Sequence, residues 1–183
     1  MRRSIYLLAA IAFAGLQGCS TGADADIAAQ VQEQADRTAI NATLIQYTTG
    51  LDMKLPDVYA GAFTADAKFM RGATPETATP MAEGTEQIRK IITDLIDSDA
   101  ASDARRKAEW KGEGSPPAWL RHHVMTNGVV EMVDASTAHH RSYWMTVSGQ
   151  GRDMKVVAMG SYQDTLVKQD GRWLISERYL LGR

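Results

Sequence analysis

The last third of the chain has the alternation of apolar and polar residues that is typical of β-strands. Four segments rich in β-branched or aromatic residues span 119–133, 137–148, 154–167 and 172–181. Turn-forming residues separate them, and Asp170-Gly171 is a strong signal for a tight hairpin. Because the connections are short, we predict four consecutive antiparallel strands.

Helical periodicity dominates the first part of the chain. Apolar residues recur in steps of four, three and four at Ile40, Leu44, Tyr47 and Leu51. This spacing predicts a helix over residues 27–49. Further helices are expected over 56–63, opened by Pro56, and over 84–96, with a strand at 67–71 between them. Helices gathered on one side of a curved antiparallel sheet define the predicted fold class as α+β.

Residues 98–117 contain few large apolar side chains and include several Asp, Ala and Gly residues. We interpret this segment as a flexible surface excursion, with a lid over the mouth of a pocket as the alternative.

The N-terminus has the pattern of an export signal. Arg2 and Arg3 precede a short apolar run that ends in Leu16-Gln17-Gly18-Cys19, which resembles the bacterial lipobox. We therefore predict a lipoprotein signal peptide over 1–18, a tether over 19–26 and one domain over 27–183. Lipidation of Cys19 would anchor the protein at the periplasmic face of a membrane, and Ser20 favours the outer membrane. A signal peptide without lipidation is the alternative.

Charge argues against one class of partner, and the cysteine content argues against internal disulfides. Removal of residues 1–18 changes the formal net charge from −2 to about −4, and no basic stripe remains. A nucleic acid is therefore not an expected partner. Cys19 is the only Cys, so an intramolecular disulfide is excluded.

Polar residues within the predicted strands are candidates for a pocket. His123, Met125 and Asn127 share one face of their strand, and His122 lies on the other. A His on the inner face can act as a general base when a carboxylate orients it, or it can be a buried His bonded to backbone. Adjacent histidines point to opposite faces, so they cannot jointly bind one ion, and we expect no metal.

Two further groups of residues extend this candidate site. Tyr47 and Asp52 lie near the end of the first helix, five residues apart, and converge only if the helix unwinds near Gly50. The alternative is a core Tyr and a helix-end Asp. Tyr59 and Arg71 are additional candidates for binding a substrate, together with Asn127.

Asp164 and Arg178 lie on the two arms of the hairpin closed at residues 170–171. We predict that they form a structural ion pair across the sheet.

An ordered set of short motifs runs from about Ala35 to Arg178. They are Gln46-Tyr47, Leu51-Asp52, Phe63-Thr64-Ala65-Asp66-Ala67, Thr126-Asn127 after His123, and Gly160-Ser161-Tyr162-Gln163-Asp164 before Asp170-Gly171-Arg172-Trp173. The set resembles SnoaL-like domains of the nuclear transport factor 2-like superfamily. This resemblance implies a cone-shaped α+β barrel, in which a curved sheet wraps around N-terminal helices and encloses a deep pocket.

Among these relatives, the chain looks similar to scytalone-dehydratase-like and bile-acid-dehydratase-like enzymes. Tyr47, Asp52 and His123 fall on positions that match their catalytic Tyr, Asp and His. The resemblance implies a dehydratase or isomerase that acts without a cofactor on a small hydrophobic carbonyl compound. A non-catalytic lipoprotein that binds a hydrophobic ligand is the alternative, and a partner-binding role, such as a homodimer formed through the outer sheet face, is a third.

Overall fold

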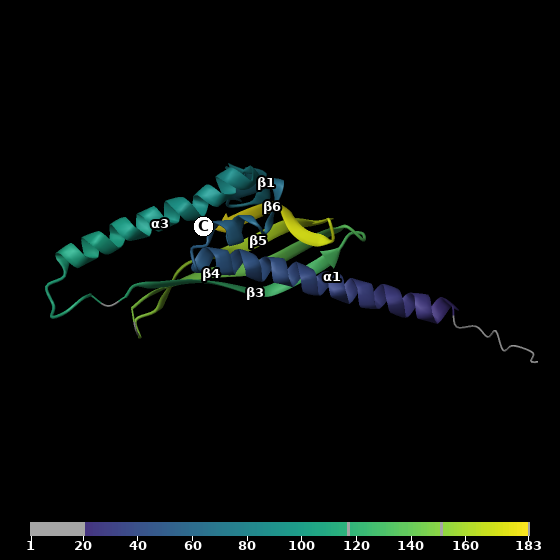
Figure 1. Ribbon diagram of the computed structural model, residues 1–183, viewed down its shortest axis with the longest axis horizontal. Helices are drawn as coiled ribbons and strands as arrows, with labels where there is room; N and C mark the ends of the chain where they lie inside the picture. Colours follow the sequence, from purple (N-terminus) through teal and green to yellow (C-terminus); the bar gives the residue numbers. More distant parts are fainter. Residues whose placement is uncertain (1–20, 117, 151, 183) are drawn as a thin grey trace, which may run out of the picture.

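The computed structural model describes residues 21–116, 118–150 and 152–182, so the predicted signal peptide, Cys19 and Ser20 lie outside the described residues. Three helices precede or interrupt a six-stranded sheet (Figure 1). The elements are α1 (Thr21–Asp52), α2 (Pro56–Ala60), β1 (Phe63–Gly72), the 3₁₀ turn η1 (Pro75–Thr77), β2 (Thr79–Glu83), α3 (Gly84–Glu109), β3 (Leu120–Met132), β4 (Thr137–Gly149), β5 (Lys155–Gln169) and β6 (Arg172–Gly182). The predicted α+β class is confirmed.

The sheet is mixed, with the strand order β2-β1-β6-β5-β4-β3. The four consecutive strands β3 to β6 pair antiparallel, as predicted. Strand β1 pairs parallel with β6, which the expectation of an antiparallel sheet did not include. This parallel pairing joins β1 to β6, so the C-terminal strand β6 lies in the middle of the sheet, between β1 and β5.

The second half of α1 packs against one face of the sheet. Its predicted apolar stripe is buried: Ile40, Leu44, Tyr47 and Leu51 are each less than a tenth exposed. Asp36 fixes the helix to the last hairpin, because its carboxylate accepts hydrogen bonds from Trp173 Nε1 at 2.8 Å and Lys168 Nζ at 2.6 Å. Burial raises the pKa of Asp36, but these donors outweigh it and hold the pKa below its ordinary value.

Two helices are longer than predicted. Helix α1 begins at Thr21 instead of residue 27, so residues 21–26 of the expected tether are helical. Helix α3 continues to Glu109, which corrects the interpretation of 98–117 as a flexible excursion. Alanines at 100, 101, 104 and 108 favour a helix, and the pairs Ser102–Ser98 and Arg106–Asp103 support it at helical spacing.

Both long helices extend beyond the sheet (Figure 1). The first turns of α1 project at one end of the molecule, and the second half of α3 projects at the other. Among the described residues, no helix is sufficiently long and apolar to cross a membrane.

Candidate functional site

Helix α1 ends with a carboxylate that faces strand β3. Asp52 is the last residue of the helix, and Lys54 adopts a left-handed conformation with φ of 55°. Leu55 N–H then donates to the Gly50 carbonyl at 2.9 Å, which closes a Schellman-type helix end. This termination fixes where the Asp52 side chain lies.

Asp52 and His123 form a hydrogen-bonded pair. The distance from His123 Nδ1 to Asp52 Oδ1 is 2.6 Å, and the His123 backbone N–H lies 3.0 and 3.1 Å from the two carboxylate oxygens. The side chain of His123 is 17% exposed, and that of Asp52 is 21% exposed. Because an ionised carboxylate only accepts, Nδ1 carries the proton and Nε2 retains a lone pair. This arrangement leaves Nε2 able to take a proton from a substrate.

His122 lies next to this pair but is held less closely. Its Nδ1 is 3.8 Å from Asp52 Oδ2, and its side chain is 58% exposed. Asp52 therefore lies near both histidines, but it orients the ring of His123 more closely than the ring of His122.

The structure does not bring Tyr47 to the Asp52–His123 pair. Its hydroxyl lies 3.2 Å from the hydroxyl of Tyr162, and the side chain is buried among Tyr59 and Phe63. Helix α1 stays regular through Asp52, so Tyr47 and Asp52 point in different directions, about 140° apart around the axis.

A buried ionic network lies beside these aromatic rings. Arg178 makes two hydrogen bonds to Asp164, with Nε to Oδ1 at 2.7 Å and Nη2 to Oδ2 at 2.8 Å. His140 Nδ1 lies 2.8 Å from the same carboxylate, and the rings of Tyr47 and Tyr162 cover the guanidinium at 3.9 and 4.3 Å. The predicted Asp164–Arg178 pair is confirmed, with a His added to it.

Burial alters the acid–base properties of this network. It raises the pKa of the Tyr162 hydroxyl well above its usual range. Burial also raises the pKa of Asp164, but the charge and hydrogen bonds of Arg178 and His140 outweigh it, so the pKa is lowered overall. Asp164 is therefore a permanent carboxylate at neutral pH.

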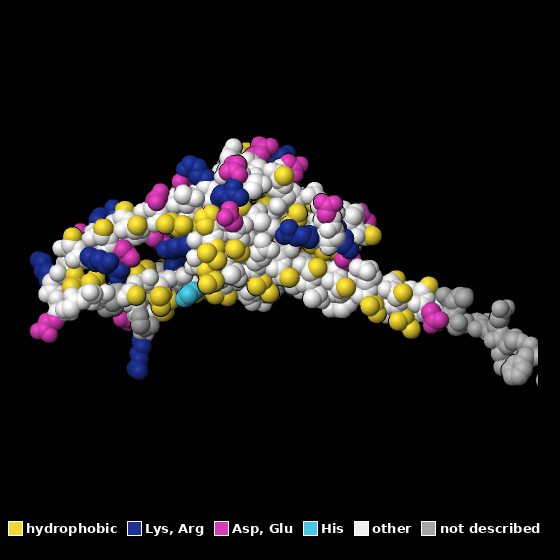
Figure 2. Space-filling view, in the orientation of Figure 1, with side chains coloured by type: hydrophobic (Ala, Val, Ile, Leu, Met, Phe, Trp, Pro, Cys, Tyr) yellow, Lys and Arg dark blue, Asp and Glu magenta, His cyan; other side chains and the backbone are white. Residues whose placement is uncertain are grey.

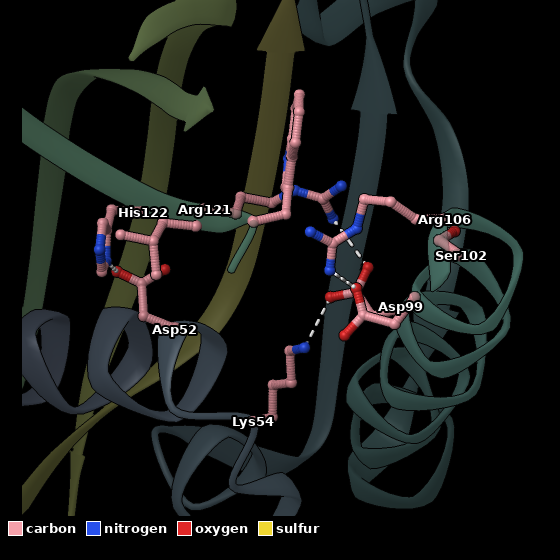
Figure 3. A pocket seen from close by; sticks show the side chains of 10 residues that line it. Asp52, Lys54, Asp99, Ser102, Arg106, Arg121 and His122 are labelled. Atoms are coloured by element: carbon pink, nitrogen blue, oxygen red, sulfur yellow. Dashed lines mark hydrogen bonds and ion pairs between the residues drawn. The ribbon is translucent and has the colours of Figure 1, made fainter. Parts of the chain in front are cut away.

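A cavity of about 520 Å³ opens at Asp52 (Figure 3). Charged and polar side chains from the end of α1, from α3 and from β3 dominate its lining: Asp52, Lys54, Asp99, Asp103, Arg106, Arg121 and His122. This lining differs from the largely apolar pocket that was expected. The aromatic residues that could have given an apolar wall fill the core under the sheet.

The three residues predicted to bind substrate lie elsewhere. Tyr59 is 1% exposed and packs in the aromatic core, and Arg71 lies on the exposed part of β1. Asn127 has φ of 54° at a β-bulge in β3 and lines a different cavity, of about 310 Å³. The structure therefore does not gather these residues around Asp52 and His123.

Sequence reasoning missed the α3 residues that line the cavity. Asp99, Ser102, Asp103 and Arg106 share one helix face, at spacings of three, one and three residues. That spacing was visible in the sequence, but only if residues 98–109 were interpreted as a helix. In the described part of the chain, no group of three or more His, Cys, Asp or Glu residues is arranged to hold a metal ion.

Several solved structures resemble this chain. A protein of unknown function from Mycobacterium tuberculosis matches with 25% identity and a TM-score of 0.59, over 84% of this chain and 75% of that chain. A candidate scytalone dehydratase from Novosphingobium aromaticivorans matches with 21% identity and a TM-score of 0.57, over 84% and 88%. An NTF2-like protein with a cystatin-like fold from the same organism matches with 14% identity and a TM-score of 0.65, over 90% of each chain.

The identities to the two Novosphingobium proteins are low, so these likenesses establish the fold alone. No curated protein matches the chain. The model of the SnoaL-like domain matches residues 32–179, which include Asp52, His123, strands β1 to β5 and most of β6. The chain therefore belongs to the SnoaL-like domain family, within the NTF2-like fold.

Proposed function

We propose that this protein is a lyase or isomerase that acts by general acid–base chemistry on a small carbonyl compound, without a cofactor. The 2.6 Å contact between His123 Nδ1 and Asp52 Oδ1 carries the proposal. The imidazole of His123 is bound to a carboxylate that lines the cavity, and such a pair has the geometry of an oriented general base.

The reaction begins when His123 Nε2 takes a proton from the carbon next to the substrate carbonyl. The electron pair of that C–H bond forms a carbon–carbon double bond and the carbonyl becomes an enolate. In a dehydration, the enolate expels a β-hydroxyl group, which leaves as water with the proton of the imidazolium. In an isomerisation, the imidazolium returns the proton to a different carbon. Asp52 stabilises the imidazolium in both cases.

The enolate oxygen needs a positive environment. Tyr47 was expected to supply it, but its hydroxyl bonds to Tyr162. Lys54 and His122 line the cavity next to Asp52 and provide positive charge or an N–H donor there instead.

A panel of β-hydroxy carbonyl compounds tests the proposal, with the conjugated product measured by ultraviolet absorbance. His123→Ala is expected to lower kcat/KM by about 10²- to 10⁴-fold, and Asp52→Asn by a comparable factor. His139→Ala is the matched control, because His139 is an exposed His on the opposite face of the same sheet. Full activity in His123→Ala would contradict the assignment of the base.

A non-catalytic ligand-binding protein is the second candidate. The separation of Tyr47 from the Asp52–His123 pair favours it, because a site for binding alone needs no third catalytic group. Binding of a panel compound without any turnover, unchanged in His123→Ala, would support this function over catalysis.

We also propose that Cys19 is lipidated and that the protein is held at the periplasmic face of a bacterial membrane. The Leu16–Cys19 motif supports this localisation. Cys19→Ala is expected to move the protein from the membrane fraction to the soluble fraction. Wild-type protein found only in the soluble fraction would contradict it.

A further inference from the structure

The second half of α3 forms one wall of the cavity. Asp99, Ser102 and Arg106 lie on the helix face that turns toward the start of β3 (Figure 3), and Asp103 lines the same cavity. Residues 98–109 therefore add a charged wall beside the Asp52–His123 pair.

The cations and carboxylates of the cavity lining pair unequally with one another. Lys54 and Arg121 both pair with Asp99, at 2.7 and 3.4 Å, so one carboxylate serves two cations. Arg106 pairs with Asp103 at 2.7 Å. The cavity lining thus has three cations and three carboxylates, and the third carboxylate, Asp52, is bound by His123. The formal charges of the lining balance, but Arg121 has to share its carboxylate with Lys54.

Arg121 is the cation that is most available to a ligand. Its contact with Asp99 is the longest of these ion pairs, and its side chain is 40% exposed. Asp99 would keep its 2.7 Å partner Lys54 if a ligand replaced it at Arg121. A guanidinium presents parallel N–H groups that match the two oxygens of a carboxylate.

An aromatic surface lies beside Arg121. Trp119 lines the same cavity, and the residue is 52% exposed. Its Nε1 donates a hydrogen bond to Ser148 Oγ at 2.6 Å, which holds the indole in place. A fixed indole offers a flat apolar face on which a planar ligand can stack.

We propose that this cavity binds the carboxylate of a small planar acid, with the carboxylate on Arg121 and the planar group against Trp119. The substrate class is then an aromatic or conjugated carbonyl acid rather than a neutral hydrophobic compound. The assignment of a substrate class rests on the proposed function. Binding of the acid can be measured without any turnover.

Two matched probes test the proposal by isothermal titration calorimetry: 2-naphthoate and its neutral methyl ester, which share one ring system. We expect the acid to bind at least about tenfold more tightly than the ester in about 50 mM NaCl, with a smaller advantage in about 500 mM NaCl. Equal binding of the two probes would overturn the proposal, as would no binding of either at about 1 mM.

Three variants assign the contacts. Arg121→Gln is expected to reduce acid binding to the level of the ester and to leave ester binding unchanged. Asp99→Asn is expected to strengthen acid binding several-fold, because it removes the carboxylate that competes for Arg121. Arg141→Gln, an exposed Arg on the other face of the sheet, is the control and should match the wild type. Acid binding that is unchanged in Arg121→Gln would overturn the assignment.

The failures of the two proposals are distinguishable. Acid binding that depends on Arg121 but gives no turnover of any panel compound would leave this inference standing and contradict the proposed catalysis. Turnover of neutral compounds that depends on His123, without preference for acids, would contradict this inference alone.

Discussion

Asp164 holds the ionic network in the interior of the protein. Its carboxylate is bound by Arg178 and His140, and both Asp164 and Arg178 have fully buried side chains. Breaking a buried pair by removing one partner leaves an uncompensated charge, which typically costs about 3–5 kcal/mol. Asp164→Asn is therefore expected to lower the free energy of unfolding by about that amount at pH 7, measured by urea denaturation.

The pH dependence of this variant has a defined sign. The pKa of Asp164 is lowered in the folded state, because Arg178 and His140 outweigh the effect of burial. The stabilisation is therefore present above the unfolded pKa of about 3.9 and is lost as the pH falls through the lower, folded pKa. The difference between wild type and Asp164→Asn should shrink below about pH 4. Asp170→Asn, in the exposed hairpin turn, is the control and should stay within about 0.5 kcal/mol of wild type.

Tyr47 provides a second test at the scale of one residue. Its hydroxyl bonds to Tyr162 and not to the Asp52–His123 pair, so we assign it a structural role. Tyr47→Phe should lower the free energy of unfolding by about 0.5–1.5 kcal/mol and change kcat/KM by no more than a few-fold. A loss of activity comparable to that of His123→Ala, with little change in stability, would contradict this assignment.

The sequence placed some of these residues correctly and others not. Strand alternation put one of the two adjacent histidines on the inner face, and the resemblance to SnoaL-like domains selected His123 and grouped it with Asp52, which its ring contacts in the structure. The partner of Tyr47 is Tyr162, 115 residues further along the chain. Such a contact depends on how the strands pair, which local spacing does not encode.

The crossing of α1 and α2 depends on a glycine. A Cβ atom at Gly50 would lie 2.4 Å from the backbone nitrogen of Tyr59, so the two helices could not remain in contact. Gly22 lies on the exposed part of α1, and a Cβ atom there would meet nothing within 4 Å.

We expect opposite effects of alanine at these two positions. Gly50→Ala should destabilise the fold by about 1–3 kcal/mol through overpacking, and should weaken activity because Asp52 lies one half-turn away. Gly22→Ala should leave the stability unchanged or raise it by up to about 1 kcal/mol, because Ala favours a helix. Thermal denaturation followed by circular dichroism measures both. Similar destabilisation by both substitutions would contradict the close approach at Gly50.

Elements were predicted well where hydrophobic periodicity is strong. The four C-terminal strands match their predicted ranges to within one or two residues. The end of α3 was missed because residues 98–109 are stabilised by Ala content and by local ion pairs, not by an apolar face. The pairing of β1 with β6 was missed because it joins segments more than 100 residues apart.

On the scale of the whole molecule, exposed apolar residues include one group on the projecting part of α1 and another on the outer face of the sheet. The projecting part of α1 exposes Ile27 and Val31, and hydrophobic side chains are visible along it in Figure 2. The outer face of the sheet exposes Val124 and Met159, which are 40% and 64% exposed and align across β3, β4 and β5. The outer face of the sheet is the more rigid of the two surfaces, because the paired strands β3, β4 and β5 fix its shape.

A homodimer through the outer sheet face remains a prediction, and its location can be tested directly. If Val124 and Met159 lie in the interface, Met159→Glu places a charge in an apolar contact and should convert the dimer to a monomer. Light scattering coupled to size-exclusion chromatography measures the mass. Ile27→Glu is the control on the projecting helix and should leave the mass unchanged. A monomeric wild type would contradict the dimer, and dissociation by Ile27→Glu alone would move the interface to α1.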